Sequence, residues 1–354
     1  MIESLKLSIV HLGIRMIKTN KAIRLIVLLV AIVLAIGACT TSQTTGKSIQ
    51  DVNKPITIGM QVGPASTLLM VAKDKGFFDE QGLNVQLIEF TAGKFALQAF
   101  LAGSLDLAAS GEVPVTFSSL QGNKFYVITQ IVERTKNEVR VVALKEGGLN
   151  TPEKYFKAKR RKLATSFGGG PEFYTYNFLK KYNIIDVEII SQKPEDMPVA
   201  LASKTVDAIA IFEPFAFFAE QKLGKDAITF KDDTLYSELY VLNAKKEWVE
   251  SNPKIVEGII RALVKASQFI EKNPEQAKSV LIKFTKLDKA VVDEIWNNFV
   301  YKPVLNDLLP KYLNEEAKWA IETGKVSKDN KVPDFDEFIY RDGLSKVKAD
   351  YVKI

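Results

Sequence analysis

Two separate stretches of this sequence alternate short β-type runs with helical segments, and this alternation restricts the fold more than any other feature. The first stretch covers residues 56–110 and the second covers residues 162–212. Strands joined by helices at this spacing pair in parallel, so each stretch predicts one parallel-sheet α/β lobe. Ligands of such sheets bind in the crevice beyond the carboxyl ends of the strands. We therefore look for functional residues where the strands end.

The predicted elements of these stretches and of the rest of the chain can be given as ranges. The first stretch has predicted strands at 56–61, 84–90 and 105–110 and helices at 66–75 and 92–102. The second has predicted strands at 162–167, 187–192 and 206–212 and helices at 171–181 and 197–204. Two β-like segments, 139–145 and 239–244, flank the second stretch, and we expect them to be the crossings between the lobes. Beyond Asn252 the pattern is almost wholly helical, with a helix starting at Pro253 and others at 274–284, 289–300 and 307–323.

The N-terminus has the pattern of a targeting segment. A basic flank over residues 18–24 precedes an uncharged run over residues 25–38, and Met16 just before it is a second candidate start. The run is shorter than the roughly 20 apolar residues that span a bilayer. It ends in Gly-Ala before Cys39, which resembles a bacterial lipobox, in which the cysteine receives lipid and becomes the new N-terminus. We predict a signal peptide at residues 1–38; the alternative is a transmembrane anchor with an incidental cysteine.

The rest of the chain lacks several kinds of reactive side chain. Residues 1–38 hold five of the 48 Lys and Arg and one of the 42 Asp and Glu, so the remainder has a net charge near +2 and no basic cluster for nucleic acid. The single histidine, His11, lies in the leader, and Cys39 is the single cysteine. Disulfides, Cys/His zinc sites and Ser-His-Asp triads are therefore excluded from residues 40–354. Acid–base catalysis stays open but disfavoured. We predict no enzyme activity, metal or cofactor.

Four stretches of sequence, in a fixed order, resemble a known family. Residues 72–85 read AKDKGFFDEQGLNV; after them come QA and DL within 98–107, GEVP at 111–114, and AL, DA and EPF within 200–215. These strings resemble the signature of ABC-transporter solute-binding proteins of the nitrate/sulfonate/taurine type, which are related to thiamine-pyrimidine synthases. Phe212 stands where the family usually has Trp, which leaves the fine specificity open.

The resemblance implies a type II periplasmic-binding-protein fold, with two α/β lobes joined by two crossings and C-terminal helices completing the first lobe. The first lobe is then expected at 55–142 and 241–354, the second at 143–240, and a Ser/Thr/Gln-rich flexible tether at 39–54. The resemblance also implies a monomer outside the cytoplasm, held to a membrane by lipid on Cys39, that delivers a small molecule to an ABC permease and its ATPase. The related synthases use a histidine and a cysteine-rich motif that residues 40–354 lack, which favours the binding members.

Glycine-containing turns at the strand ends supply the candidate ligand contacts. Glycines let a backbone approach a ligand closely, and a helix N-terminus offers unpaired N–H groups and a positive dipole end, which suits an anionic oxygen. Two acids beside these turns, Glu112 and Glu172, oppose a bare anion, so they point outward, or the ligand is a zwitterion such as taurine, or it is an uncharged pyrimidine on which Phe173, Tyr174 and Phe215 stack. The predicted ligand-binding set is Gln61, Gly63, Ser66, Ser110, Gly111, Glu112, Gly168, Gly169, Gly170, Glu172, Phe173, Glu213 and Phe215. The resemblance places Glu213 at the cleft or hinge.

The sequence thus favours a lipid-anchored, extracytoplasmic solute-binding subunit of an ABC importer that captures a small anionic or zwitterionic nutrient. One alternative is a binding protein for a thiamine-precursor pyrimidine or another uncharged aromatic ring. Alternatives of a different class are a two-lobed enzyme acting on a small acid and a receptor domain feeding a sensor kinase. Ligand recovered unchanged after incubation separates binding from catalysis.

Overall fold

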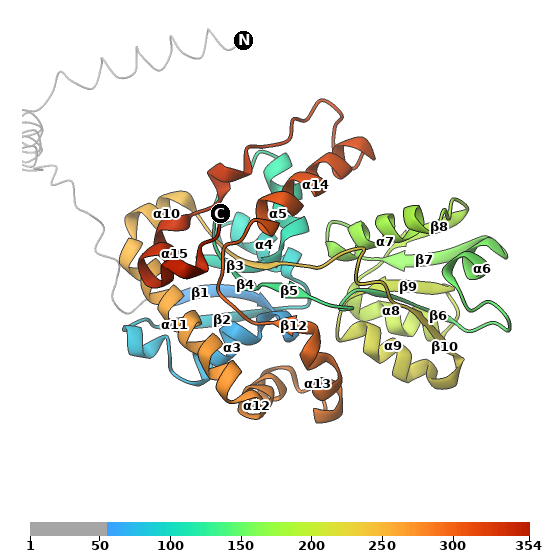
Figure 1. The fold of residues 1–354 in the computed structure, drawn as a ribbon, viewed down its shortest axis with the longest axis horizontal. Coiled ribbons are helices and arrows are strands. Elements are labelled where there is room, and N and C mark those ends of the chain that lie inside the picture. The colour runs from blue at the N-terminus through green and yellow to red at the C-terminus, as the bar shows by residue number, and fades with distance from the viewer. Residues whose placement is uncertain (1–54) are drawn as a thin grey trace, which may run out of the picture. The chain divides into compact units, whose positions relative to one another are not determined.

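The computed structural model describes residues 55–354 (Figure 1). The predicted signal peptide at 1–38, the lipid site Cys39 and the tether at 39–54 lie outside the described residues. Within residues 55–354, no helix is both long enough and apolar enough to cross a membrane.

The first lobe is built on a five-stranded sheet in the order β2-β1-β3-β11-β4. Its strands are β1 (Ile56–Gln61), β2 (Val85–Phe90), β3 (Leu107–Gly111), β4 (Tyr126–Val132) and β11 (Tyr240–Ala244). Strands β1, β2 and β3 pair in parallel, whereas β11 runs antiparallel to both of its neighbours. The expected parallel sheet is therefore mixed. The reason is that β11 enters this lobe from the cleft, so it must run away from the edge at which β1 and β3 end.

The second lobe repeats this arrangement in a sheet ordered β10-β6-β9-β7-β8 (Figure 1). Its strands are β6 (Arg140–Leu144), β7 (Arg161–Thr165), β8 (Val187–Ser191), β9 (Ala208–Ile211) and β10 (Ala227–Phe230). Strands β7, β8 and β9 are parallel, while β6 is antiparallel to β9 and β10. Its helices are α6 (Pro152–Lys157), α7 (Gly170–Lys181), α8 (Met197–Ala202) and α9 (Phe215–Leu223).

Helices cover the first sheet and are drawn from both ends of the described chain. They are α3 (Thr67–Asp74), α4 (Gly93–Leu101), α5 (Glu112–Leu120), α10 (Lys246–Ser251), α11 (Pro253–Lys272), α12 (Pro274–Thr285), α13 (Lys289–Ile295), α14 (Leu308–Glu322) and α15 (Arg341–Lys348). One-turn 3-10 helices lie at Pro64–Ser66, Asp79–Gln81, Pro194–Asp196, Gly224–Asp226, Trp296–Asn298, Phe335–Phe338 and Ala349–Tyr351. The helix expected at 289–300 is shorter, because β12 (Phe299–Val300) pairs with β5 (Arg134–Thr135).

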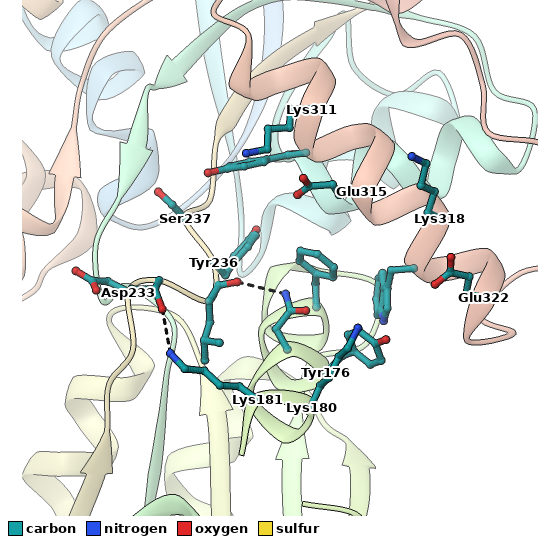
Figure 2. Close-up of a pocket in the computed structure, with 16 residues that line it drawn as sticks. Tyr176, Lys180, Lys181, Asp233, Tyr236, Ser237, Lys311, Glu315, Lys318 and Glu322 are labelled. Carbon is teal, nitrogen blue, oxygen red and sulfur yellow. Dashed lines mark hydrogen bonds between the residues drawn. The ribbon is translucent and has the colours of Figure 1, made fainter. Parts of the chain in front are cut away.

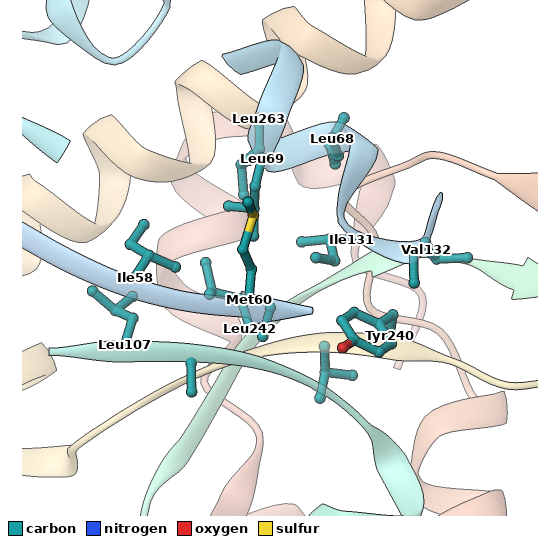
Figure 3. Packing of buried hydrophobic residues seen from close by; sticks show 14 of the residues in the cluster. Ile58, Met60, Leu68, Leu69, Leu107, Ile131, Val132, Tyr240, Leu242 and Leu263 are labelled. Carbon is teal, nitrogen blue, oxygen red and sulfur yellow. The ribbon is translucent and has the colours of Figure 1, made fainter. Parts of the chain in front are cut away.

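The core of the first lobe lies between this sheet and the helices that come from the far end of the sequence. Ile58 and Met60 of β1 point toward Leu69 of α3 and Leu263 of α11, and all four side chains are fully buried (Figure 3). Helix α11 presents its apolar stripe to α3, as its helical spacing predicted. The C-terminal helices therefore complete the first lobe.

The two β-like segments expected to be crossings are strands of the sheets. β6 pairs only within the second sheet and β11 only within the first, so the predicted division at 142/143 falls inside β6. The segments that link the sheets are residues 133–139 and 231–239, which lie just before these strands. They are hydrogen-bonded to each other, because the Ser237 hydroxyl donates to the Thr135 carbonyl oxygen at 2.8 Å.

Candidate functional site

The carboxyl ends of strands from both sheets meet around one small cavity between the lobes. Its lining residues from the first lobe are Gln61, Ala92, Gly93, Lys94, Gly111 and Pro114. Those from the second lobe are Ser166, Gly169, Gly170, Pro171 and Phe212, and the second crossing and β11 add Glu238 and Tyr240. The cavity volume is about 20 Å³, which is room for about one water molecule. The lobes are therefore closed on each other around this cavity.

Three helices begin at this cavity without a side-chain cap. The N-caps of α4, α5 and α7 are Ala92, Gly111 and Gly169, and none of the three makes a side-chain capping hydrogen bond. Backbone N–H groups in the first turn of a helix have no partner within the helix, and together with the dipole they favour an anion. The cavity thus has one wall that is suited to an acidic group.

The start of α5 differs from the expected turn at residues 111–114. Gly111 ends β3, and the helix begins at Glu112 and runs through Pro114. Proline is tolerated there because N–H groups of the first helical turn have no acceptor within the helix, so the lack of an N–H at this position costs no hydrogen bond. The strand-to-helix junction therefore brings a helix N-terminus directly to the cavity.

Lys94 adds a positive charge to the same wall and bridges the two lobes. Its ammonium group, at the start of α4 in the first lobe, donates to the Ser166 hydroxyl oxygen at 2.9 Å and to the Phe167 carbonyl oxygen at 2.8 Å. Burial lowers the pKa of Lys94, against the attraction of Glu172 and Glu195. This side chain was missed in the sequence. Its position directly after the second strand, at a carboxyl end, was the signal that could have found it.

An acidic side chain, Glu238, lies against Gly111 at the start of α5 and also lines the cavity. Glu238 lines it with 7 % of its surface exposed, and burial together with the nearby Glu138 raises the pKa of Glu238 well above its usual value. Burial also raises the pKa of Glu138 to about 7, and burial with repulsion from Glu238 raises the pKa of Glu112 to about 8. Among residues 55–354, neither Glu112 Oε1 nor Glu138 Oε2 has a hydrogen-bond partner. These acids therefore hold protons near neutral pH in the closed form.

The absence of a side chain at Gly111 makes room for this acidic group. A Cβ atom at Gly111 would collide with Oε1 of Glu238, and the backbone N–H of Leu239 donates to Glu112 Oε2 at 2.9 Å. Gly93 has the same role opposite Tyr240, because a Cβ there would lie 2.9 Å from the Cα of Ser110 and would collide with the tyrosine hydroxyl. These two glycines allow the crossing to approach the first sheet closely.

The structure brings four of the predicted ligand-binding residues to the cavity wall. They are Gln61, Gly111, Gly169 and Gly170. Six other predicted residues lie in the same strand ends, turns and first helical turns but do not line the cavity: Gly63, Ser66, Ser110, Glu112, Gly168 and Glu172. Of these, Glu172 neither points outward nor faces the cavity: its carboxylate accepts the Gly168 N–H at 2.7 Å and pairs with Lys325 at 2.6 Å.

The structure places the other three predicted residues away from the cavity. Glu213 is 1 % exposed and pairs with Arg140 at 2.5 Å, while its second oxygen accepts the N–H of Phe217 near the start of α9. Phe215 lines a separate hollow on the surface of the second lobe. Phe173 lines a groove of about 740 Å³ between α7, the second crossing and α14.

That groove is polar at its edges and aromatic at its base. Lys311, Glu315 and Lys318 project into it from α14, opposite Tyr176 and Lys180 of α7 (Figure 2). Trp319 of α14 packs against Phe173 with ring centroids 5.0 Å apart, so this contact joins the lobes outside the cavity. The larger space thus lies beside the lobe interface, whereas the strand ends converge on the smaller one.

Several named proteins are similar to this chain in sequence and in fold. A Bacillus subtilis protein named "Putative aliphatic sulfonates-binding protein" is 26% identical over 87% of this chain and 93% of its own length. The periplasmic aliphatic sulphonate binding protein SsuA of Escherichia coli superposes with a TM-score of 0.69 at 21% identity, covering 81% of this chain and 98% of SsuA. The nitrate-binding protein NrtA of Synechocystis PCC 6803 gives a TM-score of 0.66 at 15% identity, covering 84% of this chain and 90% of NrtA.

These solved structures share the two-lobed periplasmic-binding-protein fold expected from the sequence, and the relatives are named as binding proteins for aliphatic sulfonates and nitrate. The NMT1-like family matches residues 52–283, which include both five-stranded sheets of the structure. The chain belongs to the NMT1-like family, among relatives of the sulfonate- and nitrate-binding type.

Proposed function

We propose that this protein is the lipid-anchored, extracytoplasmic solute-binding subunit of an ABC importer. It captures a small anionic or zwitterionic nutrient between its lobes and delivers it to a permease driven by an ATPase. The observation that carries this proposal is the cavity wall at which α4, α5 and α7 begin uncapped beside the Lys94 ammonium group. Relatives that bind sulfonates and nitrate support the same ligand class.

The proposed mechanism is hinge closure. In the open form one lobe binds the nutrient, and closure brings the other lobe's strand ends onto it and expels water. The predicted site residues Gln61, Gly111, Gly169 and Gly170 then contact the ligand through backbone groups and the Gln61 amide. Cys39 carries the lipid, and the protein acts as a monomer.

Two measurements test this function. Native mass spectrometry of freshly purified protein is expected to detect a small molecule of mass consistent with an anion or zwitterion, recovered unchanged. Small-angle scattering of protein stripped of that molecule and then saturated with it is expected to show a smaller radius of gyration. An identical scattering profile at saturation, or a chemically altered product, would contradict the proposal.

A further inference from the structure

An ion pair between Lys325 and Glu172 joins the two lobes near the ligand cavity. The Nζ atom of Lys325 lies 2.6 Å from Oε1 of Glu172, whose side chain is 7 % exposed. Glu172 belongs to the first turn of α7 in the second lobe, and Gly169 and Gly170 at the start of the same helix line the cavity. Lys325 follows α14, a helix of the first lobe. The two partners therefore separate when the lobes separate.

Glu172 places a negative charge beside the start of α7. Its second oxygen, Oε2, accepts the N–H of Gly168 at 2.7 Å, directly before the N-cap Gly169. A carboxylate in the first turn of a helix interacts favourably with the positive end of the dipole, so it opposes any further anion there. With no cation beside it, Glu172 would repel an acidic ligand group held at Gly169 and Gly170.

The end of α14 fixes the position of Lys325 on the first lobe. Gly324 ends the helix with a φ of 69°, and the backbone N–H of Lys325 donates to the Ala320 carbonyl oxygen at 2.9 Å, as in a Schellman motif. Helix α14 packs on α5, where the Thr116 hydroxyl donates to Glu316 Oε2 at 2.7 Å. The backbone of Lys325 therefore moves with the first lobe.

Two lysines of the first lobe contact the same loop of the second lobe, residues 166–172. Lys94 donates to the Ser166 hydroxyl oxygen and to the Phe167 carbonyl oxygen. Lys325 pairs with Glu172, and its Nζ atom lies 4.8 Å from the centroid of the Phe167 ring. Closure thus brings two positive charges to this loop, and one of them offsets the charge of Glu172.

We infer that Lys325 is a positioning residue of the ligand site: by neutralising Glu172 on closure, it makes the start of α7 receptive to the acidic group of the ligand. Lys325 acts through Glu172, because it does not line the cavity itself. This inference rests on the proposed function and deepens it. The acidic group binds first to the first lobe, at Lys94 and the starts of α4 and α5, and α7 joins the site when Lys325 arrives.

The sign of the charge separates this role from that of a contact that only holds the lobes together. The Lys325–Glu172 pair is neutral in the wild type and in the double variant Lys325→Met with Glu172→Gln. Lys325→Met leaves one negative charge beside the start of α7, and Glu172→Gln leaves one positive charge. Glutamine keeps an oxygen that can accept the Gly168 N–H, so Glu172→Gln changes the charge with little change in shape.

The inference is tested by calorimetry on the purified full chain. Binding of ethanesulfonate, taurine and nitrate is measured for the wild type, and the tightest of the three is then titrated into each variant. Lys325→Met is expected to bind this probe about 10-fold more weakly, and Glu172→Gln about threefold or more tightly, because the local charge changes in opposite directions. The double variant should lie within about threefold of the wild type, so Glu172→Gln rescues Lys325→Met.

Two further variants serve as controls. Lys325→Arg keeps the charge and should stay within about threefold of the wild type. Lys328→Met removes an exposed lysine from the same loop and should also stay within that range, which separates the ion pair from the net charge of the chain.

Several outcomes would contradict the inference and leave the proposed function standing. They are wild-type affinity in Lys325→Met, an equal loss in Lys328→Met, or weaker binding in both single variants with no recovery in the double variant. The last pattern is that of a purely structural contact. If none of the three probes binds to the wild type, the proposed ligand class is contradicted, and the inference with it.

Discussion

The Nζ atom of Lys94 lies 2.9 Å from the hydroxyl oxygen of Ser166, and this hydrogen bond joins the two lobes at the edge of the ligand cavity. The same ammonium group lines the cavity and donates to the Phe167 carbonyl oxygen. One side chain thus serves as a contact between the lobes and as a positive charge available to a ligand. In the proposed function, closure and ligand capture are coupled through it.

Replacing Lys94 by Ala is expected to favour the open form. Two hydrogen bonds from a charged donor are lost between the lobes, which shifts the equilibrium about tenfold or more toward opening. Small-angle scattering of the free protein should then give a larger radius of gyration than the wild type. Lys157→Ala, an exposed lysine on α6, should leave the profile unchanged. Identical profiles for wild type and Lys94→Ala would show that this contact does not hold the lobes together.

Gly111→Ala is expected to destabilise the protein through Glu238. The added methyl group collides with the glutamate carboxylate, and overpacking of this kind typically costs about 1–3 kcal/mol. In the double variant Gly111→Ala with Glu238→Ala the obstacle is gone, so most of the loss should be recovered relative to Glu238→Ala alone. Urea unfolding of the four proteins gives the coupling free energy. Strictly additive effects would mean that the two residues do not meet in solution.

The free energy of unfolding should fall as the pH rises from 5 to 8. In the folded protein the pKa is about 8 for Glu112 and about 7 for Glu138, against an ordinary value of 4.5, so the folded state binds more protons than the unfolded state in this range. Stability then decreases with rising pH, by on the order of 6 kcal/mol for these two acids together. Glu146 and Asp232, whose pKa is lowered to about 2 by ion pairing and hydrogen bonding, are ionised in both states above pH 5 and add no slope.

Urea denaturation at pH 5, 6, 7 and 8 measures this slope. Glu138→Gln removes one of the acids whose pKa is raised, so its stability should vary less with pH than that of the wild type. A wild-type stability that rises with pH over this range would contradict the assigned burial of the acidic group.

Arg140→Met is expected to destabilise the second lobe strongly. Arg140 binds Glu213 at 2.5 Å and Glu220 through two hydrogen bonds of 2.9 and 2.7 Å, and both Arg140 and Glu213 are almost fully buried. Removing the arginine leaves Glu213 unpaired in the interior, a change that costs about 3–5 kcal/mol. Adding Glu213→Gln should recover part of that loss. The exposed pair Arg160 and Asp186 provides the control, because Arg160→Met should change stability by less than about 1 kcal/mol.

Most of the secondary structure could be predicted because it depends on local patterns. The strand expected at 56–61 is β1 itself, and the helix expected at 171–181 differs from α7 by one residue. Elements with weaker local patterns were not predicted, among them β4 and the short strands β5 and β10. The two-residue strand β5 exists only because β12 lies beside it, and no local periodicity indicates a pairing over that distance.

The location of the candidate site could be predicted from the sequence, but only some of the residues that form it. The glycine turns at Gly111 and Gly169 reached the cavity, because the rule that ligands bind beyond strand ends depends on topology alone. Glu213 was expected as a ligand or hinge contact; it does not line the cavity, and its carboxylate is paired with Arg140, which directly follows the first crossing and lies 73 positions away. Tertiary packing determines which residue pairs with Glu213, so the spacing of residues along the sequence does not predict it.

The sequence by itself determined the alternating strands and helices, the apolar stripe of α11 and the family to which the chain belongs. Each of these depends on residues that lie close together in the sequence. Only the tertiary structure decided that Glu238 and Lys94 line the same cavity. The two residues lie on different segments, and the folding of a crossing strand back into the first sheet brings them together. Long-range contacts of this kind depend on how the lobes pack, and packing is a property of the whole chain.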